Sequence, residues 1–291
     1  MKNLIITCLI IFLVAIHSLN ASVETPLQPK FISVSTGITL EYVEQGDPSG
    51  KTIIFLHGLS DSWHSFGALL NHVPASIHAI AISQRGHGNS ERPMKGYHPK
   101  DFAADVAAFI RKKKTGPVII AGHSMGGVVA QQFAIDYPQL CLALVIIDSD
   151  PAWHDNPGMD EFCKQASKLN VEIDRPFMDE FQRSTLAKPI DNRYYELLVN
   201  EGLKVPARVF QAALHEMLTT DFREQLREVS IPVLIFWGEQ DLFCSLKDQE
   251  DFTRSLKNSQ LLQYENTGHA LHWEEPERCA GDLVKFINRL M

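Results

Sequence analysis

Short apolar runs recur along the chain, and most of them lack the polar alternation of a half-exposed strand. Continuous apolar runs of this length are typical of strands buried on both faces of a parallel sheet. The first two runs are separated by Thr36-Gly37 and predict a β-hairpin instead. The predicted strands span residues 31–34, 38–43, 51–56, 77–82, a run beginning at Val118, 142–147, 231–238 and 261–264.

Apolar residues at helical spacing separate several of these runs. Residues 101–110 place Phe102, Val106 and Phe109 on one stripe, and the chain closes with a predicted helix over about 276–290. Strands that alternate with helices predict an α/β fold, in which a doubly wound, mostly parallel sheet has helices on both faces.

The strand pattern stops between about residues 151 and 227. Amphipathic helices are predicted in this region over 159–169 and 207–218. We therefore predict a helical cap at 151–227, inserted into a core that is formed by 22–150 and 228–291.

The first 21 residues have the pattern of an export signal. Lys2 precedes an unbroken apolar run over 4–16, which is too short to span a bilayer comfortably as a helix. Cleavage is expected after Ala21, although Leu19 occupies a position at which a small residue is preferred. We predict an exported protein, periplasmic or secreted, without a membrane span after cleavage. An uncleaved N-terminal anchor is the alternative.

Composition and charge narrow the functional classes. Of the 291 residues, 45% are hydrophobic and 21% are charged, as in a globular protein. The net charge of −8 and the lack of a long basic run argue against a nucleic-acid partner. Removal of Cys8 with the signal leaves four cysteines, which either form two disulfides in one of three pairings or remain thiols. They are Cys141, Cys163, Cys244 and Cys279. The sequence carries no signal for an oligomeric state.

One motif carries the candidate chemistry. The run from Val118 passes into Gly122-His123-Ser124-Met125-Gly126, which fits Gly-x-Ser-x-Gly between a strand and a helix. In this arrangement the serine lies at the apex of a sharp turn that exposes its hydroxyl, and the glycines leave room for neighbouring backbone. The N–H of Met125 lies at the positive end of the new helix, where it can stabilise an oxyanion. Ser124 is therefore the candidate nucleophile.

Other motifs surround this one in a fixed order. They are His57-Gly58, Arg85-Gly86-His87-Gly88, then the serine motif, Gly238-Glu239-Gln240-Asp241 and Gly268-His269. Together they resemble the α/β-hydrolase superfamily across nearly all of the predicted mature chain. Many members carry aspartate where this chain has Ser83, but that position is usually structural in the superfamily.

The resemblance implies a role for each matching residue. Ser124 would be the nucleophile, His269 the general base and acid, and Asp241 the residue that orients the imidazole. The backbone N–H groups of Leu59 and Met125 would form the oxyanion hole.

Two other aspartates compete for the role of triad acid. Asp148 ends a core strand, where some relatives place their acid, and Asp150 lies slightly further along the chain. We favour Asp241 because its Gly-x-x-Asp turn lets a carboxylate reach the imidazole from beside the sheet. Asp148 is then interpreted as a polar cap where the chain leaves the sheet.

The implied activity is hydrolysis of a small ester, lactone or related acyl compound through an acyl-enzyme. Alternatives of the same fold are C–C bond hydrolysis and cofactor-free haloperoxidase or perhydrolase chemistry. The alternative from another class is a ligand-binding receptor without turnover. A serine nucleophile argues against the dehalogenase and epoxide hydrolase branches, which use aspartate at this position.

The last predictions concern the substrate pocket. The cap is expected to be mobile over Ser124, with apolar side chains that bind the hydrocarbon part of the substrate. The candidate pocket residues are Trp63, Phe162, Phe181 and Phe210. The sequence contains no metal-ligand spacing and no nucleotide-binding loop, so neither a metal nor a cofactor is expected. A small-molecule acyl substrate is the predicted partner.

Overall fold

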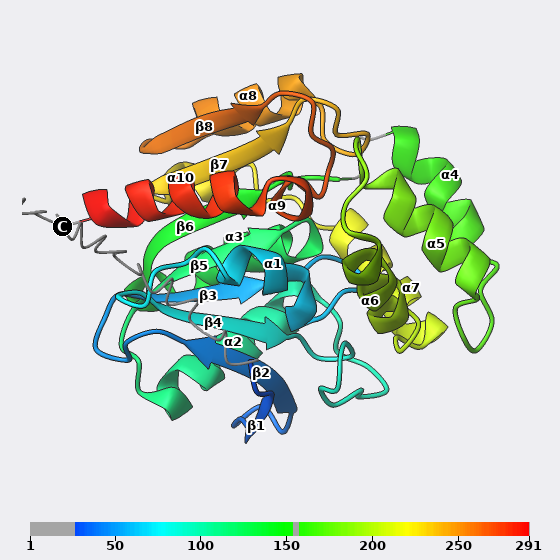
Figure 1. Ribbon diagram of the computed structural model, residues 1–291, viewed down its shortest axis with the longest axis horizontal. Helices are drawn as coiled ribbons and strands as arrows, with labels where there is room; N and C mark the ends of the chain where they lie inside the picture. Colours follow the sequence, from blue (N-terminus) through cyan, green and yellow to red (C-terminus); the bar gives the residue numbers. More distant parts are fainter. Residues whose placement is uncertain (1–26, 154–156, 291) are drawn as a thin grey trace, which may run out of the picture.

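The computed structural model describes residues 27–153 and 157–290 and shows a single sheet between layers of helices (Figure 1). Eight strands pair in the order β1-β2-β4-β3-β5-β6-β7-β8. β1 and β2 are antiparallel to their neighbours, and β3 to β8 are parallel. The predicted doubly wound, mostly parallel sheet is thus confirmed. The strands are β1 (Lys30–Ser33), β2 (Thr39–Gln45), β3 (Thr52–Leu56), β4 (His78–Ser83), β5 (Val118–His123), β6 (Cys141–Ile147), β7 (Val233–Gly238) and β8 (Ser259–Tyr264).

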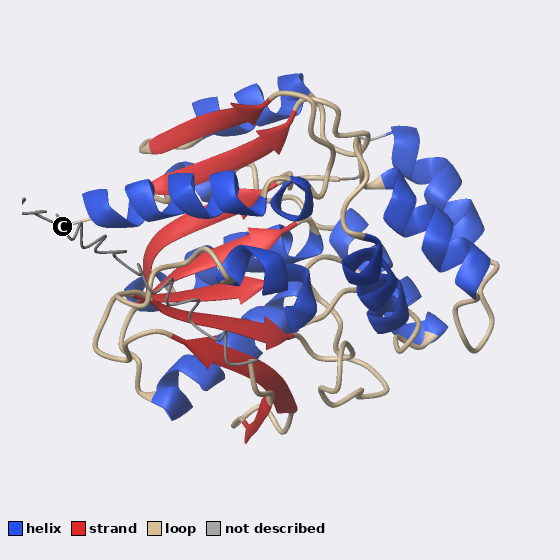
Figure 2. Ribbon diagram, viewed as in Figure 1, coloured by secondary structure: helices blue, strands red, loops and turns tan. Residues whose placement is uncertain are grey.

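Helices cover both faces of this sheet (Figure 2). On one face, Phe102, Phe133 and Phe252 enter a buried cluster from α2, α3 and α8. On the other face, Leu70 from α1 and Leu283 from α10 enter a second cluster. The helices and short turns of the core are η1 (Trp63–Phe66), α1 (Gly67–Leu70), α2 (Pro99–Lys113), α3 (Met125–Asp136), η2 (Pro138–Leu140), α8 (Leu246–Ser255), α9 (Leu271–Glu274) and α10 (Pro276–Arg289).

The order of the strands creates a crevice at one edge of the sheet. β3 and β5 pair directly, although β4 lies between them in the chain. The strand order reverses at this point, and open α/β sheets bind ligands outside the carboxyl ends of such strands. The oxyanion-hole candidate Leu59 follows β3, and Ser124 follows β5. Asp241 and His269 follow β7 and β8, so the topology brings all four residues to the same edge.

A layer of helices lies beyond this edge (Figure 1). In the chain these helices come after β6 and before β7, in the region where the cap is predicted. These helices are α4 (Pro157–Ala166), α5 (Arg175–Ser184), α6 (Asn192–Gly202) and α7 (Ala207–Leu218), with the turn η3 (Gln225–Glu228) after them. The predicted signal at residues 1–21 lies outside the described residues. Within 27–153 and 157–290, no helix is long and apolar enough to cross a membrane.

Candidate active site

Ser124 lies at the sharp turn between β5 and α3, with φ 51° and ψ −119°. Residues other than glycine rarely adopt this conformation, and such strain is typical of functional sites. The Ser124 N–H donates to Ile147 O at 3.0 Å, and the Ser149 hydroxyl donates to Ser124 O at 2.8 Å. A Cβ on Gly122 would lie 2.0 Å from Gly126 O, and one on Gly126 would lie 2.1 Å from a carbonyl oxygen of β3. Both glycines of the motif are therefore required for the turn.

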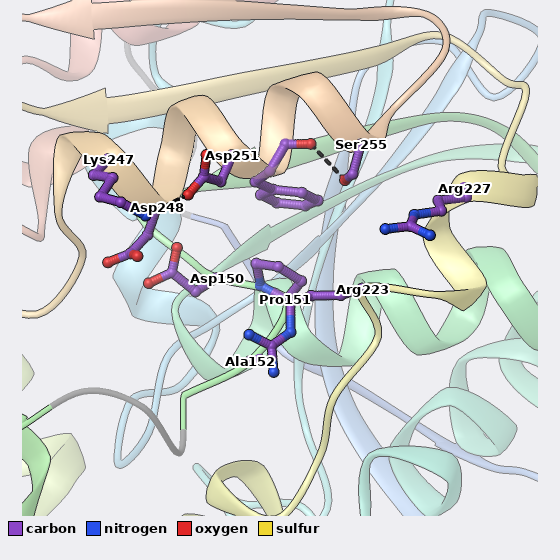
Figure 3. A pocket seen from close by; sticks show the side chains of 10 residues that line it. Asp150, Pro151, Ala152, Arg223, Arg227, Lys247, Asp248, Asp251 and Ser255 are labelled. Carbon is purple, nitrogen blue, oxygen red and sulfur yellow. Dashed lines mark hydrogen bonds and ion pairs between the residues drawn. The ribbon is translucent and has the colours of Figure 1, made fainter.

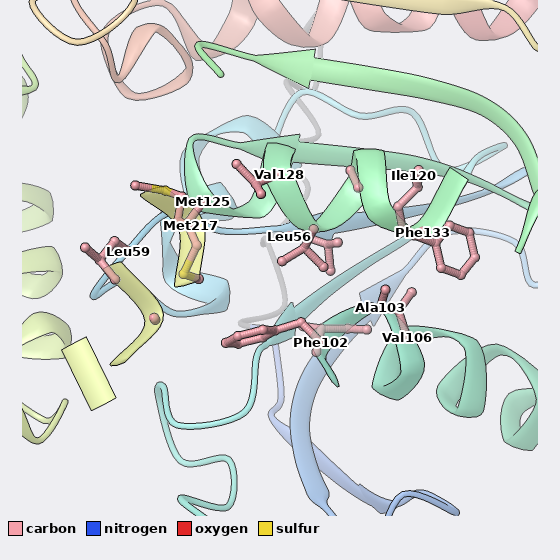
Figure 4. Close-up of a cluster of buried hydrophobic side chains, with 14 of the residues drawn as sticks. Leu56, Leu59, Phe102, Ala103, Val106, Ile120, Met125, Val128, Phe133 and Met217 are labelled. Atoms are coloured by element: carbon pink, nitrogen blue, oxygen red, sulfur yellow. The ribbon is translucent and has the colours of Figure 1, made fainter. Parts of the chain in front are cut away.

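A second turn, residues 57–61, follows β3. The Asp61 N–H donates to Gly58 O at 3.3 Å, and Ser60 has φ 68°. The side chains of Leu59, in this turn, and Met125, at the start of α3, belong to the same buried cluster (Figure 4). The structure thus places both residues whose N–H groups are predicted to bind an oxyanion after the carboxyl ends of the neighbouring strands β3 and β5.

The His57 ring stabilises this second turn through hydrogen bonds to backbone atoms. Its Nδ1 lies 2.8 Å from Gly58 O, and its Nε2 accepts the Gln84 N–H at 2.9 Å. Burial lowers the pKa of His57 well below its usual value, so the ring is neutral and Nδ1 carries the proton. Both ring nitrogens are therefore used to hold backbone.

His269 and Asp241 form a hydrogen-bonded pair, with Nδ1 2.9 Å from Oδ2. The other carboxylate oxygen accepts the N–H groups of Phe243 at 2.7 Å and Cys244 at 3.1 Å. Solvent reaches only 5% of the His269 side chain and none of the Asp241 side chain. These bonds fix the carboxylate and favour the imidazole tautomer with its proton on Nδ1, which leaves Nε2 to accept a proton.

His123 connects the serine turn to the loop that carries His269. Its Nε2 lies 2.9 Å from His269 O, and the two ring centroids are 5.0 Å apart. Burial lowers the pKa of His123 well below its usual value, so a neutral ring donates its Nε2–H to that carbonyl. Because Ser124 is the next residue, the candidate nucleophile and base lie on adjoining loops.

Asp148, the alternative triad acid, is engaged with the backbone. It has φ 44°, and its Oδ1 accepts the Gly238 N–H at 2.8 Å. Burial raises the pKa of Asp148 well above its usual value, and the nearby Asp241 carboxylate raises it further. The structure therefore pairs His269 with Asp241 and places Asp148 under the loop that carries this acid.

Asp150, the third candidate acid, lines a cavity that neither Asp241 nor His269 lines. This cavity has a volume of about 390 Å³ and lies between the start of the cap and α8 (Figure 3). Arg223 and Asp248 also line it, and the Asp150 carboxylate accepts the Gln249 side-chain amide. Asp150 thus has structural partners of its own.

Three of the predicted pocket residues gather in one aromatic cluster within the cap. Phe162 stacks on Phe181 with ring centroids 5.0 Å apart, and Phe210 lies 6.0 Å from the first and 5.8 Å from the second. Phe177 extends the cluster, 5.7 Å from Phe210. Phe210 itself is fully buried among these rings.

Phe243 extends this cluster to the His269–Asp241 pair and was not predicted from the sequence. Its ring lies 6.4 Å from that of Phe181 and 4.8 Å from that of His269. The available signal is its position two residues after Asp241, because residues that follow a triad acid lie at the same edge of the sheet. The aromatic cluster therefore leads from the cap directly to His269.

Trp63, the fourth predicted pocket residue, lies outside this cluster. Its ring stacks on His64 at 3.7 Å and lines a separate groove with Tyr194. Its backbone N–H donates to the Ser83 hydroxyl at 3.1 Å, which in turn donates to Glu41 at 2.9 Å. Ser83, where the superfamily often has aspartate, thus takes part in a buried structural network.

The side chains around the His269–Asp241 pair include potential metal ligands. Within the described residues, Asp241, Cys244 and His269 each place one potential ligand atom within 4.8 Å of the others. Carboxylate, thiolate and imidazole are all zinc ligands. However, the 2.9 Å between Nδ1 and Oδ2 is a direct hydrogen bond, shorter than the roughly 3.3 Å between two such ligands on a tetrahedral zinc ion. The geometry is that of an acid–base pair, and we assign no metal to it.

Comparison with known proteins agrees with this fold. A family model described as alpha/beta hydrolase fold matches residues 51–276. The 2-(acetamidomethylene)succinate hydrolase of Mesorhizobium japonicum is 38% identical over 264 residues, which cover 86% of this chain and 92% of that protein. The bifunctional esterase/perhydrolase DCH of Acinetobacter calcoaceticus is 24% identical over 279 residues, which cover 88% and 99%. Among solved structures, an esterase from Exiguobacterium antarcticum matches with a TM-score of 0.81 at 22% identity, over 90% of this chain and 100% of that chain, which shows the shared fold.

Proposed function

The chain belongs to the alpha/beta hydrolase family, and from that premise we propose that it is a serine hydrolase that cleaves a small ester, lactone or related acyl compound through an acyl-enzyme. One observation carries this proposal: the 2.9 Å hydrogen bond between His269 and Asp241, at the edge of the sheet where Ser124 occupies a strained turn. An oriented imidazole beside a serine at a strand–turn–helix apex is the arrangement that activates a hydroxyl.

The first half-reaction forms the acyl-enzyme. His269 Nε2 takes the hydroxyl proton of Ser124 while Oγ attacks the acyl carbon. Asp241 keeps the imidazole oriented and stabilises its positive charge. The N–H groups of Leu59 and Met125 donate to the oxyanion. Collapse of the tetrahedral intermediate breaks the bond to the leaving group, which takes the proton from His269.

The second half-reaction releases the acid. His269 removes a proton from water, and the resulting hydroxide oxygen attacks the acyl carbon. When the bond to Ser124 breaks, its Oγ recovers the proton from His269. The free enzyme is then restored, and the sum of the two steps is hydrolysis.

The surroundings of His269 favour an apolar, uncharged acyl group. The rings of Phe243 and Trp153 lie 4.8 Å and 6.2 Å from the imidazole, and the cap cluster continues from Phe243. Pockets lined in this way bind hydrocarbon and exclude water. The Mesorhizobium relative is named for a succinate derivative, a dicarboxylate. The aromatic neighbours of His269 favour a monoacyl substrate without such charges.

Two measurements on the purified mature protein test the proposal. A fluorophosphonate probe is expected to label the wild type at Ser124 and to leave Ser124→Ala unlabelled. A short-chain nitrophenyl ester is expected to give a burst of nitrophenol equal to the enzyme concentration. A panel of esters, thioesters, amides and lactones then ranks the acyl chemistry. Ligand binding without labelling or burst would favour the receptor alternative and overturn the proposal.

A further inference from the structure

The C-terminal end of α5 contacts the turn at residues 57–61, called the oxyanion turn below because it carries the predicted donor Leu59. The contacts are buried hydrogen bonds. The Gln182 side-chain amide donates to Asp61 Oδ1 at 3.1 Å and lies 3.5 Å from Ser60 Oγ. The Ser60 hydroxyl donates to the sulfur of Met178, one turn earlier in α5. Gln182 is 1% exposed and Asp61 2%, so water does not compete for these bonds. Because Leu59 precedes Ser60, α5 is bonded to the residues that fix the predicted oxyanion donor.

The same end of the cap also contacts the loop that carries His269. The Ala270 N–H donates to Thr185 O at 2.9 Å. A Cβ on Gly268 would lie 2.6 Å from Thr185 O and 2.7 Å from Ala187 N. The cap backbone therefore packs directly on the residues before and after His269.

Glu274, at the end of α9, holds this second contact together. Its Oε1 accepts the N–H groups of Ala187 at 2.6 Å and Lys188 at 3.3 Å. Its Oε2 accepts the Gly268 N–H at 3.1 Å. One carboxylate thus bonds the cap segment and the histidine loop, and residues 182–188 connect that loop to the oxyanion turn.

We propose that Gln182 is a positioning residue, which acts through Asp61 to hold the oxyanion turn at a fixed separation from the loop that carries His269. The inference rests on the proposed function. Oxyanion donors stabilise a transition state only when they are aligned in advance, and a small displacement has a large effect on rate. Gln182 need not touch the substrate for this role. Residues 182–188 then keep a fixed position relative to the oxyanion turn and the His269 loop. Any movement of the cap is confined to its other segments.

The test compares Gln182→Met with a matched control in the same cap. Methionine keeps the length and approximate volume of glutamine but removes the N–H donor. The control is Gln211→Met, because in the described part of the chain the Gln211 amide in α7 donates within the cap, to Ala166 O and Leu169 O at 2.9 Å each. Gln182→Met is expected to lower both the fluorophosphonate labelling rate and kcat by about 10- to 100-fold, with KM changed by less than about 3-fold. Gln211→Met is expected to change each by less than about 3-fold.

The outcomes separate this inference from the proposed function. If the wild type is not labelled, the proposed function fails and this inference fails with it. If the wild type is labelled but a folded Gln182→Met is labelled equally fast, or loses only in KM, the positioning role alone is overturned. Gln182→Asn retains the amide on a shorter side chain and gives a milder second test. Gln182→Asn is expected to lower kcat by a smaller factor than Gln182→Met. A wild-type kcat in Gln182→Asn also contradicts the role.

Discussion

Hydrogen-bond donors distinguish the buried carboxyl groups near His269. Asp241 accepts the imidazole and the N–H groups of Phe243 and Cys244, which are the donors that an ionised carboxylate needs. Asp148 has fewer donors: its carboxyl accepts the Gly238 N–H through Oδ1 and interacts with the backbone N–H of Leu271. A buried carboxyl with few donors retains its proton. Asp241 is therefore the better candidate for the triad acid.

Substitution of each aspartate tests this choice. Asp241→Asn is expected to lower kcat by roughly ten-thousand-fold, because the imidazole loses the partner that sets its tautomer. Its thermal midpoint is expected to change little. Asp148→Asn keeps an oxygen for the Gly238 N–H, so its kcat is expected to stay within about 10-fold of the wild type. Steady-state kinetics with thermal unfolding decide between them, and an active Asp241→Asn beside an inactive Asp148→Asn reverses the assignment.

Asp61 adds a dependence of stability on pH. Burial raises the pKa of Asp61 to about 7, although hydrogen bonds from Gln182 and Ser65 oppose the rise. His269 and Tyr194 are titratable groups that interact with it. An unfolded aspartate titrates near pH ~4. Between about pH 4 and about pH 7 the folded protein thus retains a proton that the unfolded chain has lost, so the free energy of unfolding falls as the pH rises.

The matching prediction concerns Asp61→Asn, which imitates the protonated carboxyl and does not titrate. In the wild type, the titration of Asp61 alone is expected to lower the free energy of unfolding by about 1 to 4 kcal/mol between about pH 4 and about pH 7. The free energy of unfolding of Asp61→Asn is therefore expected to fall less than that of the wild type between about pH 4.5 and about pH 8. Urea unfolding at both pH values measures the difference. Equal declines for the two proteins would show that Asp61 does not keep its proton in the folded state.

Helices and strands were predicted best where the apolar pattern alone determines them. The helix predicted from residue 101 begins at Pro99, because the His98 side chain and Asp101 form a capping box before the apolar stripe starts. β8 begins at Ser259, two residues before its apolar part, because backbone pairing with Val233 extends the strand. α5 was not predicted individually. Its two buried residues, Met178 and Gln182, contact Ser60 and Asp61 in the turn after β3.

The aromatic cluster between cap and core makes a prediction about acyl selectivity. Phe243 is half-buried between this cluster and His269, so Phe243→Ala removes apolar contact next to the reacting acyl group. We expect kcat/KM for a medium-chain or aromatic acyl ester to fall about 10-fold relative to an acetyl ester. The measurement is the ratio of kcat/KM across an acyl series of nitrophenyl esters.

Two further variants make this prediction specific. Trp63→Phe is expected to leave the ratio unchanged, because Trp63 lies in a separate groove. Phe210→Ala affects a fully buried ring, so a loss of about 3 to 5 kcal/mol in stability is expected beside any change in selectivity. An unaltered ratio in Phe243→Ala would place the acyl group elsewhere.

Across the molecule, the sequence predicted the residues that local motifs define and missed the contacts between distant segments. Ser124 was predictable because the glycines that its turn requires are its neighbours in the chain. The pairing of His269 with Asp241 followed from the resemblance. The contact of Gln182 with Asp61 joins residues 121 positions apart, and no local pattern encodes it. Phe243 had a local signal, its position two residues after Asp241, but its contact with Phe181 in the cap likewise joins distant segments.

The four cysteines of the predicted mature chain differ in exposure, and this bears on the prediction that the protein is exported. No disulfide links Cys141, Cys163, Cys244 and Cys279 in the described part of the chain. Cys163 in α4 is half-buried, and the other three are buried. Burial raises the pKa of Cys141 to about 12 and holds the pKa values of Cys244 and Cys279 well above the usual range. Because the thiolate is the reactive form, these three are protected from oxidation even in an oxidising compartment.

We therefore propose that the protein is exported with Cys141, Cys244 and Cys279 as thiols. Mass spectrometry of protein from its native host is expected to show a start near Ser22. Without reductant, these three cysteines are expected to resist alkylation in the native state and to react only after unfolding, because their sulfurs are buried. Reductant should leave the thermal midpoint unchanged. Alkylation of these three cysteines that first requires reduction would establish disulfides instead, and an intact Met1 on soluble cytoplasmic protein would contradict export.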